Sequence, residues 1–282
     1  MLKAAVTVFL VAVVYSSGDV IDYDTQGEWG GVCNKEESKN QSPVDVISSE
    51  TSTEVDAKFV ELSSGQGLAA TNENNLNAIK IKFTETIKYM IPWMENTEGT
   101  VAQLHLHWGA QDSDGSENWL DGKQFSAEAH LVTSYGDGSK YAVINRFFKV
   151  GAENAQIAKM IASAEAEGEN RDIADFDLSA LFPSDIKEVI TYEGGLTTPE
   201  CDEVVHWIVV PEPLTISTAQ LAKLRVVKLG DGTGDAKTFN WRNKQDLNER
   251  TFKHYKMKTS ASAATVISPL LALLALIVNV LC

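Results

Sequence analysis

The stretch from residue 101 to residue 109 constrains the fold most, because its histidines alternate with apolar residues. It reads Val-Ala-Gln-Leu-His-Leu-His-Trp-Gly. Side chains of a β-strand alternate between its two faces with a period of two. Gln103, His105 and His107 therefore share one face, and the apolar residues between them share the other. The stretch predicts a strand with one buried apolar face and one face that carries histidines.

A second stretch, from residue 125 to residue 132, alternates in the same way. It reads Phe-Ser-Ala-Glu-Ala-His-Leu-Val and places Glu128 and His130 on one face. Turn-forming residues lie between the two stretches, at 112–116 and at 121–122. They predict that the two strands fold back on each other, so that three imidazoles converge on one point.

Three histidines with an open fourth position are the ligand set of a catalytic zinc ion, and neutral imidazole is a preferred zinc ligand. Gln103 and Glu128 each precede a histidine by two residues. Each could accept a hydrogen bond from the second ring nitrogen of that histidine and fix its tautomer. A His-x-His pair alone is also compatible with the polar surface of a strand. The third histidine, with its own carboxylate, favours the metal site.

Several motifs together resemble the α-class carbonic anhydrases, in the order of that family and near its spacings, from about residue 23 to about residue 256. The motifs are His-Leu-His-Trp-Gly at 105–109, Gly-Ser-Glu at 115–117, Ala-Glu-Ala-His-Leu-Val at 127–132, Gly-Leu-Thr-Thr-Pro at 195–199, Gln-Ser-Pro-Val at 41–44, Phe-Lys-Val-Gly at 148–151 and Asn-Trp-Arg at 240–242. The resemblance implies a zinc enzyme that interconverts carbon dioxide and bicarbonate and is inhibited by sulfonamides and anions. Residues 198–203 resemble the membrane-anchored branch of the family.

The resemblance also implies a role for each residue of the site. Zinc would lower the pKa of a bound water so that hydroxide forms near neutral pH, a property already known for carbonic anhydrases. The zinc ligands would be His105, His107 and His130, supported by Gln103, the Asn240 carbonyl and Glu128. The Thr197 hydroxyl would accept a hydrogen bond from the attacking hydroxide and donate a hydrogen bond to Glu117, which aims a lone pair of the hydroxide oxygen at the substrate.

The substrate would rest against an apolar wall, and Thr198 would contact bicarbonate. The implied wall residues are Val132, Val143, Leu196, Val205 and Trp207. Fast members of the family also carry a histidine in the cavity that removes the proton. Alignment of residues 72–77 puts Asn74 at this shuttle position, and asparagine cannot titrate. We therefore expect proton removal to limit turnover.

Further elements follow from residue patterns. Strands are predicted at 55–62, 68–70, 78–91 and 141–150 from their β-branched and aromatic content. A further strand, buried on both faces apart from His206, is predicted at 204–210 from a continuous apolar run. Helices are predicted at 152–167 from the apolar spacing and at 217–224 from a capping box. His206 is interpreted as a satisfied core residue and 250–258 as a solvated tail. With the resemblance, the fold class is mainly β (α+β), a single domain around a large twisted, mostly antiparallel central sheet with a few short surface helices.

The domain is expected to span residues 19–258, with a targeting segment at each end. Residues 1–18 have a basic start, an apolar run and small residues, the pattern of a secretory signal peptide. Residues 259–282 join small residues to a terminal apolar run, the pattern of a signal for glycolipid (GPI) attachment. A plain tail anchor remains an alternative. The expected location is the extracellular face of the plasma membrane.

Cysteine usage agrees with this compartment. Cys282 would leave with the tail, so Cys33 and Cys201 remain, and a disulfide is the default in an exported chain. The pair also resembles the single bridge of extracellular carbonic anhydrases. A net charge of −15 argues against nucleic acid as a partner. The resemblance implies a small-molecule substrate, carbon dioxide or bicarbonate, and the pattern of residues 259–282 predicts a lipid anchor to the membrane. A catalytically silent relative that acts as a binding protein is disfavoured, because its histidine triad would be broken.

Overall fold

The computed structural model describes most of the chain between Val20 and Lys258. The described residues are 20–49, 51–73, 76–165, 171–229 and 236–258. The predicted signal peptide, the predicted attachment signal and Asn74 lie outside them.

Strands dominate the described residues. They are β1 (Asp45–Val46), β2 (Thr53–Val55), β3 (Glu61–Leu62), β4 (Leu68–Asn72), β5 (Lys80–Phe83), β6 (Lys88–Ile91), β7 (Thr97–Trp108), β8 (Trp119–Leu120), β9 (Ala127–Tyr135), β10 (Lys140–Val150), β11 (Asp172–Phe176), β12 (Glu188–Gly194), β13 (Val205–Val209), β14 (Leu214–Ile216) and β15 (Lys253–Met257). The α-helices are α1 (Ala155–Glu165) and α2 (Thr218–Leu224). Short 3₁₀ turns lie at Gln26–Glu28 and Leu178–Ala180.

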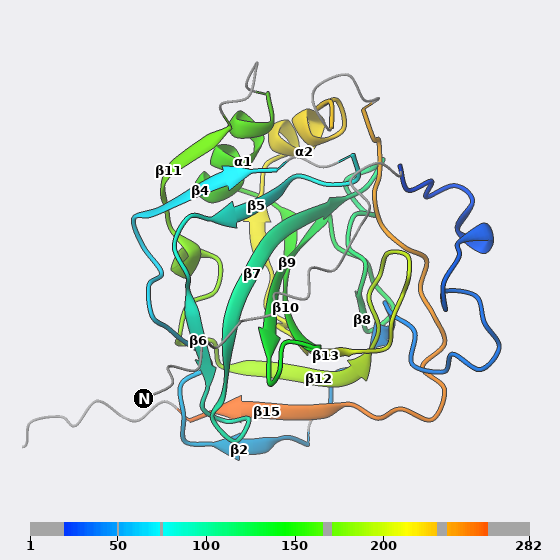
Figure 1. Ribbon diagram of the computed structural model, residues 1–282, viewed down its shortest axis with the longest axis vertical. Helices are drawn as coiled ribbons and strands as arrows, with labels where there is room; N and C mark the ends of the chain where they lie inside the picture. The colour runs from blue at the N-terminus through cyan, green and yellow to red at the C-terminus, as the bar shows by residue number, and fades with distance from the viewer. Residues whose placement is uncertain (1–19, 50, 74–75, 166–170, 230–235, 259–282) are drawn as a thin grey trace, which may run out of the picture.

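One large twisted sheet forms the body of the molecule (Figure 1). Its strand order is β11-β4-β5-β7-β9-β10-β13-β12-β15-β2, with β6 beside β7, β3 beside β6 and β14 beside β10. Most pairs are antiparallel, whereas β10 runs parallel to β13 and β14, and β15 runs parallel to β2. The predicted fold class is confirmed.

The two histidine-bearing stretches form neighbouring strands at the centre of this sheet. In the antiparallel pair of β7 and β9, His105 lies directly opposite His130. The alternate residues of both strands, such as Leu106 and Ala129, are buried in the main core. In the connection between the two strands the backbone passes so close to itself that only glycine fits at residues 109 and 115. A Cβ added at Gly109 would lie 2.1 Å from the Asp114 carbonyl oxygen, and one added at Gly115 would lie 1.9 Å from the Ser126 carbonyl oxygen. The alternation in the sequence thus predicted both the strands and their buried faces.

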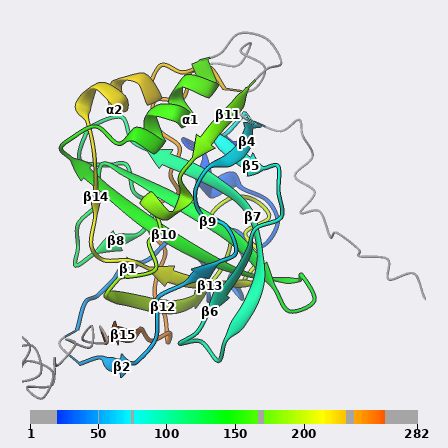
Figure 2. The ribbon, with the colours of Figure 1, turned by 90° about the vertical axis from the view of Figure 1, so that its left-hand side faces the viewer.

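The helices lie together at one end of the molecule (Figures 1 and 2). Helix α1 buries Ile157, Met160 and Ile161, the residues whose spacing predicted it. It begins at Ala155 because the Asn154 side chain accepts from the backbone N–H of Gln156 and Ile157. The capping box of α2 is confirmed. Within the described ranges no helix has the length and apolarity needed to cross a membrane.

Three predicted elements differ from the structure. In the predicted strand at 55–62 only the two ends are in strands, the first in β2 and the last in β3. The predicted strand at 78–91 is divided into β5 and β6 by polar residues at 84–86. The interpretation of 250–258 as a solvated tail was wrong, since β15 pairs with β12 and β2. Its alternate residues Tyr255 and Met257 pack on the core, a period-two pattern that charged neighbours obscured.

Candidate metal centre

The three predicted ligands meet on one face of β7 and β9. One ring nitrogen from each of His105, His107 and His130 lies within 4.8 Å of the others. The Nε2 atoms of His105 and His107 are 3.0 Å apart. A tetrahedral zinc ion with Zn–N bonds of 2.0–2.1 Å would separate two such nitrogens by about 3.3 Å. The spacing therefore matches a shared metal ion.

The remaining ring nitrogen of each histidine has an acceptor. Nδ1 of His105 is 2.8 Å from Gln103 Oε1, and Nδ1 of His107 is 2.7 Å from the Asn240 carbonyl oxygen. Nε2 of His130 is 2.8 Å from Glu128 Oε1. These contacts place a proton on each outer nitrogen and leave lone pairs on His105 Nε2, His107 Nε2 and His130 Nδ1.

Buried lone pairs in contact repel one another unless a cation lies between them. Burial holds the pKa of His105 and His130 well below the usual range, and the neighbouring imidazole of His107 adds to this effect. Burial also lowers the pKa of His107, although the Asn240 carbonyl opposes this. The three rings are therefore neutral near pH 7, the state that binds a metal ion. This donor set fits zinc.

Glu117 lies beside the converging nitrogens. Its Oε2 is 3.4 Å from His107 Nε2, and its Oε1 accepts from the Arg242 backbone N–H at 2.9 Å. Burial raises the pKa of this carboxyl well above its usual range, while the Thr197 hydroxyl and the Arg242 N–H oppose that rise. Thr197 and Glu117, which come from distant parts of the sequence, are thus brought together at the metal centre.

A model of eukaryotic-type carbonic anhydrases matches residues 24–256 of the chain. The chain belongs to the carbonic anhydrase family. Carbonic anhydrase 3 of Homo sapiens is 30% identical over 243 residues, which are 80% of this chain and 93% of that protein. Carbonic anhydrase 3 of Bos taurus is 31% identical over 225 residues, which are 73% of this chain and 85% of the bovine protein. The predicted resemblance from about 23 to about 256 is confirmed.

As a carbonic anhydrase, the protein is a zinc enzyme that hydrates carbon dioxide reversibly. Its substrate is a small molecule, and the inhibition by sulfonamides that is typical of the family is expected for it. When bound, the zinc ion supplies a water that is deprotonated near neutral pH, the chemistry for which carbonic anhydrases are known. His105, His107 and His130 would hold this ion.

The metal centre of this carbonic anhydrase lies in a cavity of about 1400 Å³. Five of the residues predicted to contact substrate line it, namely Val132, Val143, Leu196, Thr198 and Trp207. The sixth, Val205, is not among the lining residues but is buried in the same apolar cluster as Val132, Val143 and Trp207. Trp207 is held by a hydrogen bond to the Gly195 carbonyl oxygen and by stacking on Tyr192. The wall is therefore rigid and mostly apolar.

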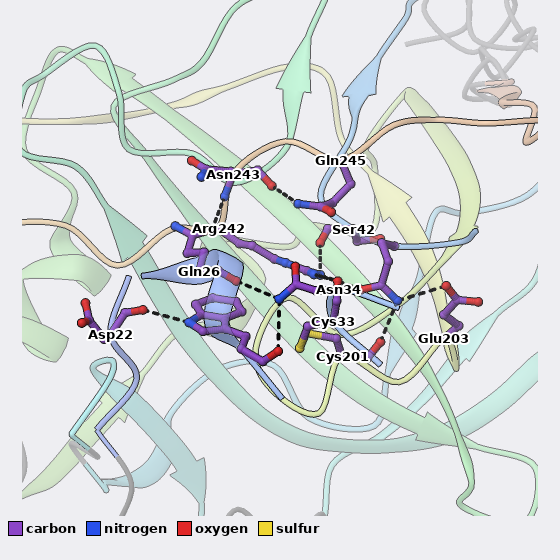
Figure 3. The surroundings of a disulfide bond; sticks show 12 residues. Asp22, Gln26, Cys33, Asn34, Ser42, Cys201, Glu203, Arg242, Asn243 and Gln245 are labelled. Atoms are coloured by element: carbon purple, nitrogen blue, oxygen red, sulfur yellow. Dashed lines mark hydrogen bonds between the residues drawn. A yellow bond between two sulfur atoms is a disulfide. The ribbon is translucent and has the colours of Figure 1, made fainter. Parts of the chain in front are cut away.

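Arg242 connects the site to the amino-terminal segment (Figure 3). Its guanidinium donates to Gln41 Oε1, to the Ser42 carbonyl and to the Cys33 carbonyl, each within 2.9 Å. Cys33 forms the predicted disulfide with Cys201, which lies just beyond the Thr197 loop. The Asn-Trp-Arg motif thus supports the centre from two positions, through the Asn240 carbonyl and through Arg242.

Residues that the sequence did not single out also belong to the site. Asn118 and Asn145 donate to Glu128, and Asn77 lines the cavity. Buried asparagines carry no periodic signal, so only the contacts identify them.

The interpretation of His206 as a core histidine with satisfied hydrogen bonds holds only in part. Its Nδ1 contacts Glu193 Oε1 at 2.6 Å, whereas its buried Nε2 has no hydrogen-bond partner in the described part of the chain.

Proposed function

We propose that this chain hydrates carbon dioxide at the cell surface and that removal of the proton limits its turnover. The observation behind the second part is the lining of the cavity. Among the described residues, the only histidines that line it are the three metal ligands. The residues needed to bind zinc and hydrate carbon dioxide are thus present, whereas no imidazole among the described residues is placed to carry the proton from the metal centre to solvent.

The residues of the wall have separate tasks in this proposal. Val132, Val143 and Trp207 offer an apolar surface for a linear, uncharged substrate. Thr197 lies beside Glu117, and in this proposal its hydroxyl donates to that carboxylate while its oxygen accepts a hydrogen bond from the cavity side. This directionality orients the attacking oxygen toward the wall. Support comes from the burial of Glu117 and from the backbone N–H of Arg242, which fixes its other oxygen.

One asparagine of the stretch 72–77, which contains the predicted shuttle position in the sequence, lines the cavity. Asn74 lies outside the described residues, but Asn77 of the same stretch lines the cavity and is 8% exposed. Its Oδ1 accepts from the Ile21 backbone N–H at 2.7 Å. An amide at either position cannot accept a proton near neutral pH.

Glu73 is a poor substitute for the missing imidazole. Its carboxylate contacts Lys80 at 2.7 Å and Lys82 at 2.6 Å. Burial alone would raise its pKa, but the hydrogen bonds to the two lysines outweigh burial and lower it. A carboxylate with a lowered pKa holds a proton weakly, and an efficient relay needs a pKa near the working pH.

Buffer dependence tests the limit on proton transfer. We expect the turnover number of the natural enzyme to rise steeply with the concentration of an imidazole buffer, which can enter the cavity and accept the proton. Replacing Asn77 by His should raise turnover in weak buffer by about tenfold, since general acid–base groups contribute 10²–10⁴-fold when well placed. The ratio kcat/KM should stay nearly constant because it reports the hydration step.

Two comparisons make this test decisive. Asn77→Gln controls for the lost contact with Ile21, and Asn74→His tests the position that the alignment predicts. A turnover that is already high and indifferent to buffer would refute the proposal and reveal another relay, such as a free amino terminus.

The proposed location depends on the two ends of the chain and on the disulfide. Residues 1–18 and 259–282 carry the patterns of export and of lipid attachment. The bridge between Cys33 and Cys201 supports export, because disulfides persist in oxidising compartments. The described domain between these ends contributes no membrane-spanning helix. A lipid anchor that replaces residues 259–282 would join the domain to the membrane.

Treatment of intact cells with phosphatidylinositol-specific phospholipase tests the anchor. We expect hydration activity to move from the membrane to the medium, and we expect peptides from residues 269–282 to be absent from the mature protein. Replacing the tail by a known transmembrane helix gives a control that the phospholipase cannot release. Recovery of a membrane-bound peptide containing Leu281 would show a tail anchor instead.

A further inference from the structure

A buried carboxylate at the metal centre receives hydrogen bonds from every side. Glu128 Oε1 contacts His130 Nε2 at 2.8 Å, Asn118 Nδ2 at 2.8 Å and Asn145 Nδ2 at 3.0 Å. Its Oε2 accepts from the backbone N–H of Asn118 at 2.9 Å. All four of these residues are buried. Because an ionised carboxylate only accepts hydrogen bonds, surrounding it with donors is what keeps it in place without solvent.

The orientation of the Asn145 amide is fixed by a contact on its other side. Asn145 lies on β10 directly opposite His130 on β9. Its Oδ1 accepts from the Val210 backbone N–H at 2.8 Å, just beyond β13. If the amide were flipped, its NH₂ group would face the Val210 N–H, donor against donor, and its oxygen would face the Glu128 carboxylate, acceptor against acceptor. The N–H of Asn145 must therefore point at Glu128.

The second amide is held in the same manner. Asn118 Oδ1 accepts from the Tyr192 hydroxyl at 2.7 Å, which leaves its Nδ2 for Glu128. The Val210 N–H can only donate, so it fixes the Asn145 amide from behind, whereas the Tyr192 hydroxyl supplies the donor that the Asn118 amide oxygen needs. Both asparagines present N–H groups to the carboxylate.

We propose that Asn145 is a positioning residue for the metal centre, acting through Glu128 on His130. With two amides supplying donors, Glu128 accepts from Nε2 of His130, and Nδ1 keeps its lone pair toward the metal. Loss of the Asn145 donor leaves Glu128 one hydrogen bond short in a site that water does not reach. The carboxylate can then shift toward another donor, and the orientation of the His130 ring is no longer fixed.

This inference is independent of the proposed location and of the limit on proton transfer, because it concerns retention of the metal. Two variants separate the donor from the rest of the side chain. Asn145→Leu removes the donor to Glu128 and the acceptor for Val210. Asn145→Asp has nearly the same shape and keeps an acceptor for Val210, but it places an acceptor against Glu128.

Zinc dissociation into a chelator, measured on the zinc-loaded protein, is the main readout. Changing the outer partners of a metal ligand typically costs 10–100-fold in metal affinity, so we expect zinc to leave at least tenfold faster from both variants. The absorption spectrum of the cobalt-substituted protein should also change, since it reports the geometry of the ligands.

Asn72 provides a matched control. It is buried on β4, and its Nδ2 donates to Ser163 Oγ at 2.9 Å. Asn72→Leu should lower the melting temperature while leaving zinc dissociation and the cobalt spectrum unchanged. The proposal is overturned if Asn145→Asp retains zinc normally, because the effect of Asn145→Leu would then come from Val210. It is also overturned if zinc loss merely follows melting temperature across all three variants.

Discussion

Replacing His130 by alanine should cost the protein its zinc and its hydration activity together. The three imidazoles are neutral and converge within 4.8 Å, with each outer nitrogen already bonded to an acceptor. Zinc bound by protein side chains is held by about 10–16 kcal/mol in structural sites. If three ligands share such a sum equally, one ligand contributes about 4 kcal/mol, or about a thousandfold in affinity. A centre with two imidazoles would lose its metal at ordinary zinc concentrations.

Metal analysis of the purified protein, with a carbon dioxide hydration assay on the same sample, measures this effect. His254→Ala is the matched control, since His254 lies on β15 and does not line the cavity. It should keep both zinc and activity. Normal zinc content with full hydration activity in His130→Ala would contradict the assignment of the ligands.

The central strands were predictable because their burial follows a period of two. From residue 104 to residue 108 in β7 and from residue 127 to residue 131 in β9, every second residue enters the core, and the histidines occupy the alternate positions. Nearer its start, β7 has a bulge between Val101 and Gln103, and Ala102, which the alternation predicted on the buried face, is exposed. The same rule applies to β15, but there the exposed Lys256 and Lys258 alternate with the core-facing Tyr255 and Met257, so the stretch resembles a solvated segment. Charged residues on the exposed face therefore obscured, in the sequence, the period-two burial pattern that the structure shows.

The candidate site was predictable only as far as its residues lie close in sequence or match a family motif. Gln103 and Glu128 sit two residues from their histidines, so strand geometry places them. Asn145 on β10 reaches Glu128 on the neighbouring strand β9, and the backbone N–H of Val210, just beyond β13, orients the Asn145 amide. Those contacts depend on the register of β9, β10 and β13, which no local pattern specifies.

Removing the bridge between Cys33 and Cys201 is expected to give the largest loss of stability. The bridged residues are 168 positions apart, and the chain-entropy model assigns such a loop about 5 kcal/mol as an upper figure. For a domain of this size, each kcal/mol shifts the melting temperature by about 2–4 °C. The double variant Cys33→Ser with Cys201→Ser should therefore melt about 10–20 °C lower, as measured by calorimetry on the zinc-loaded protein.

Without the bridge, the active site should lose its structure on warming before the rest of the domain unfolds. The Val32 backbone N–H donates to the Glu200 carbonyl, and Gln41 Nε2 donates to the Cys201 carbonyl. The bridge thus fastens the segment that follows Thr197 and Thr198 to the amino-terminal segment. On warming, the double variant should lose hydration activity below its melting temperature while zinc stays bound, because the histidines lie on β7 and β9. Cys282→Ser, with the bridge intact, should match the natural protein. An unchanged melting temperature in the double variant would show that Arg242 and the surrounding hydrogen bonds hold this segment without the bridge.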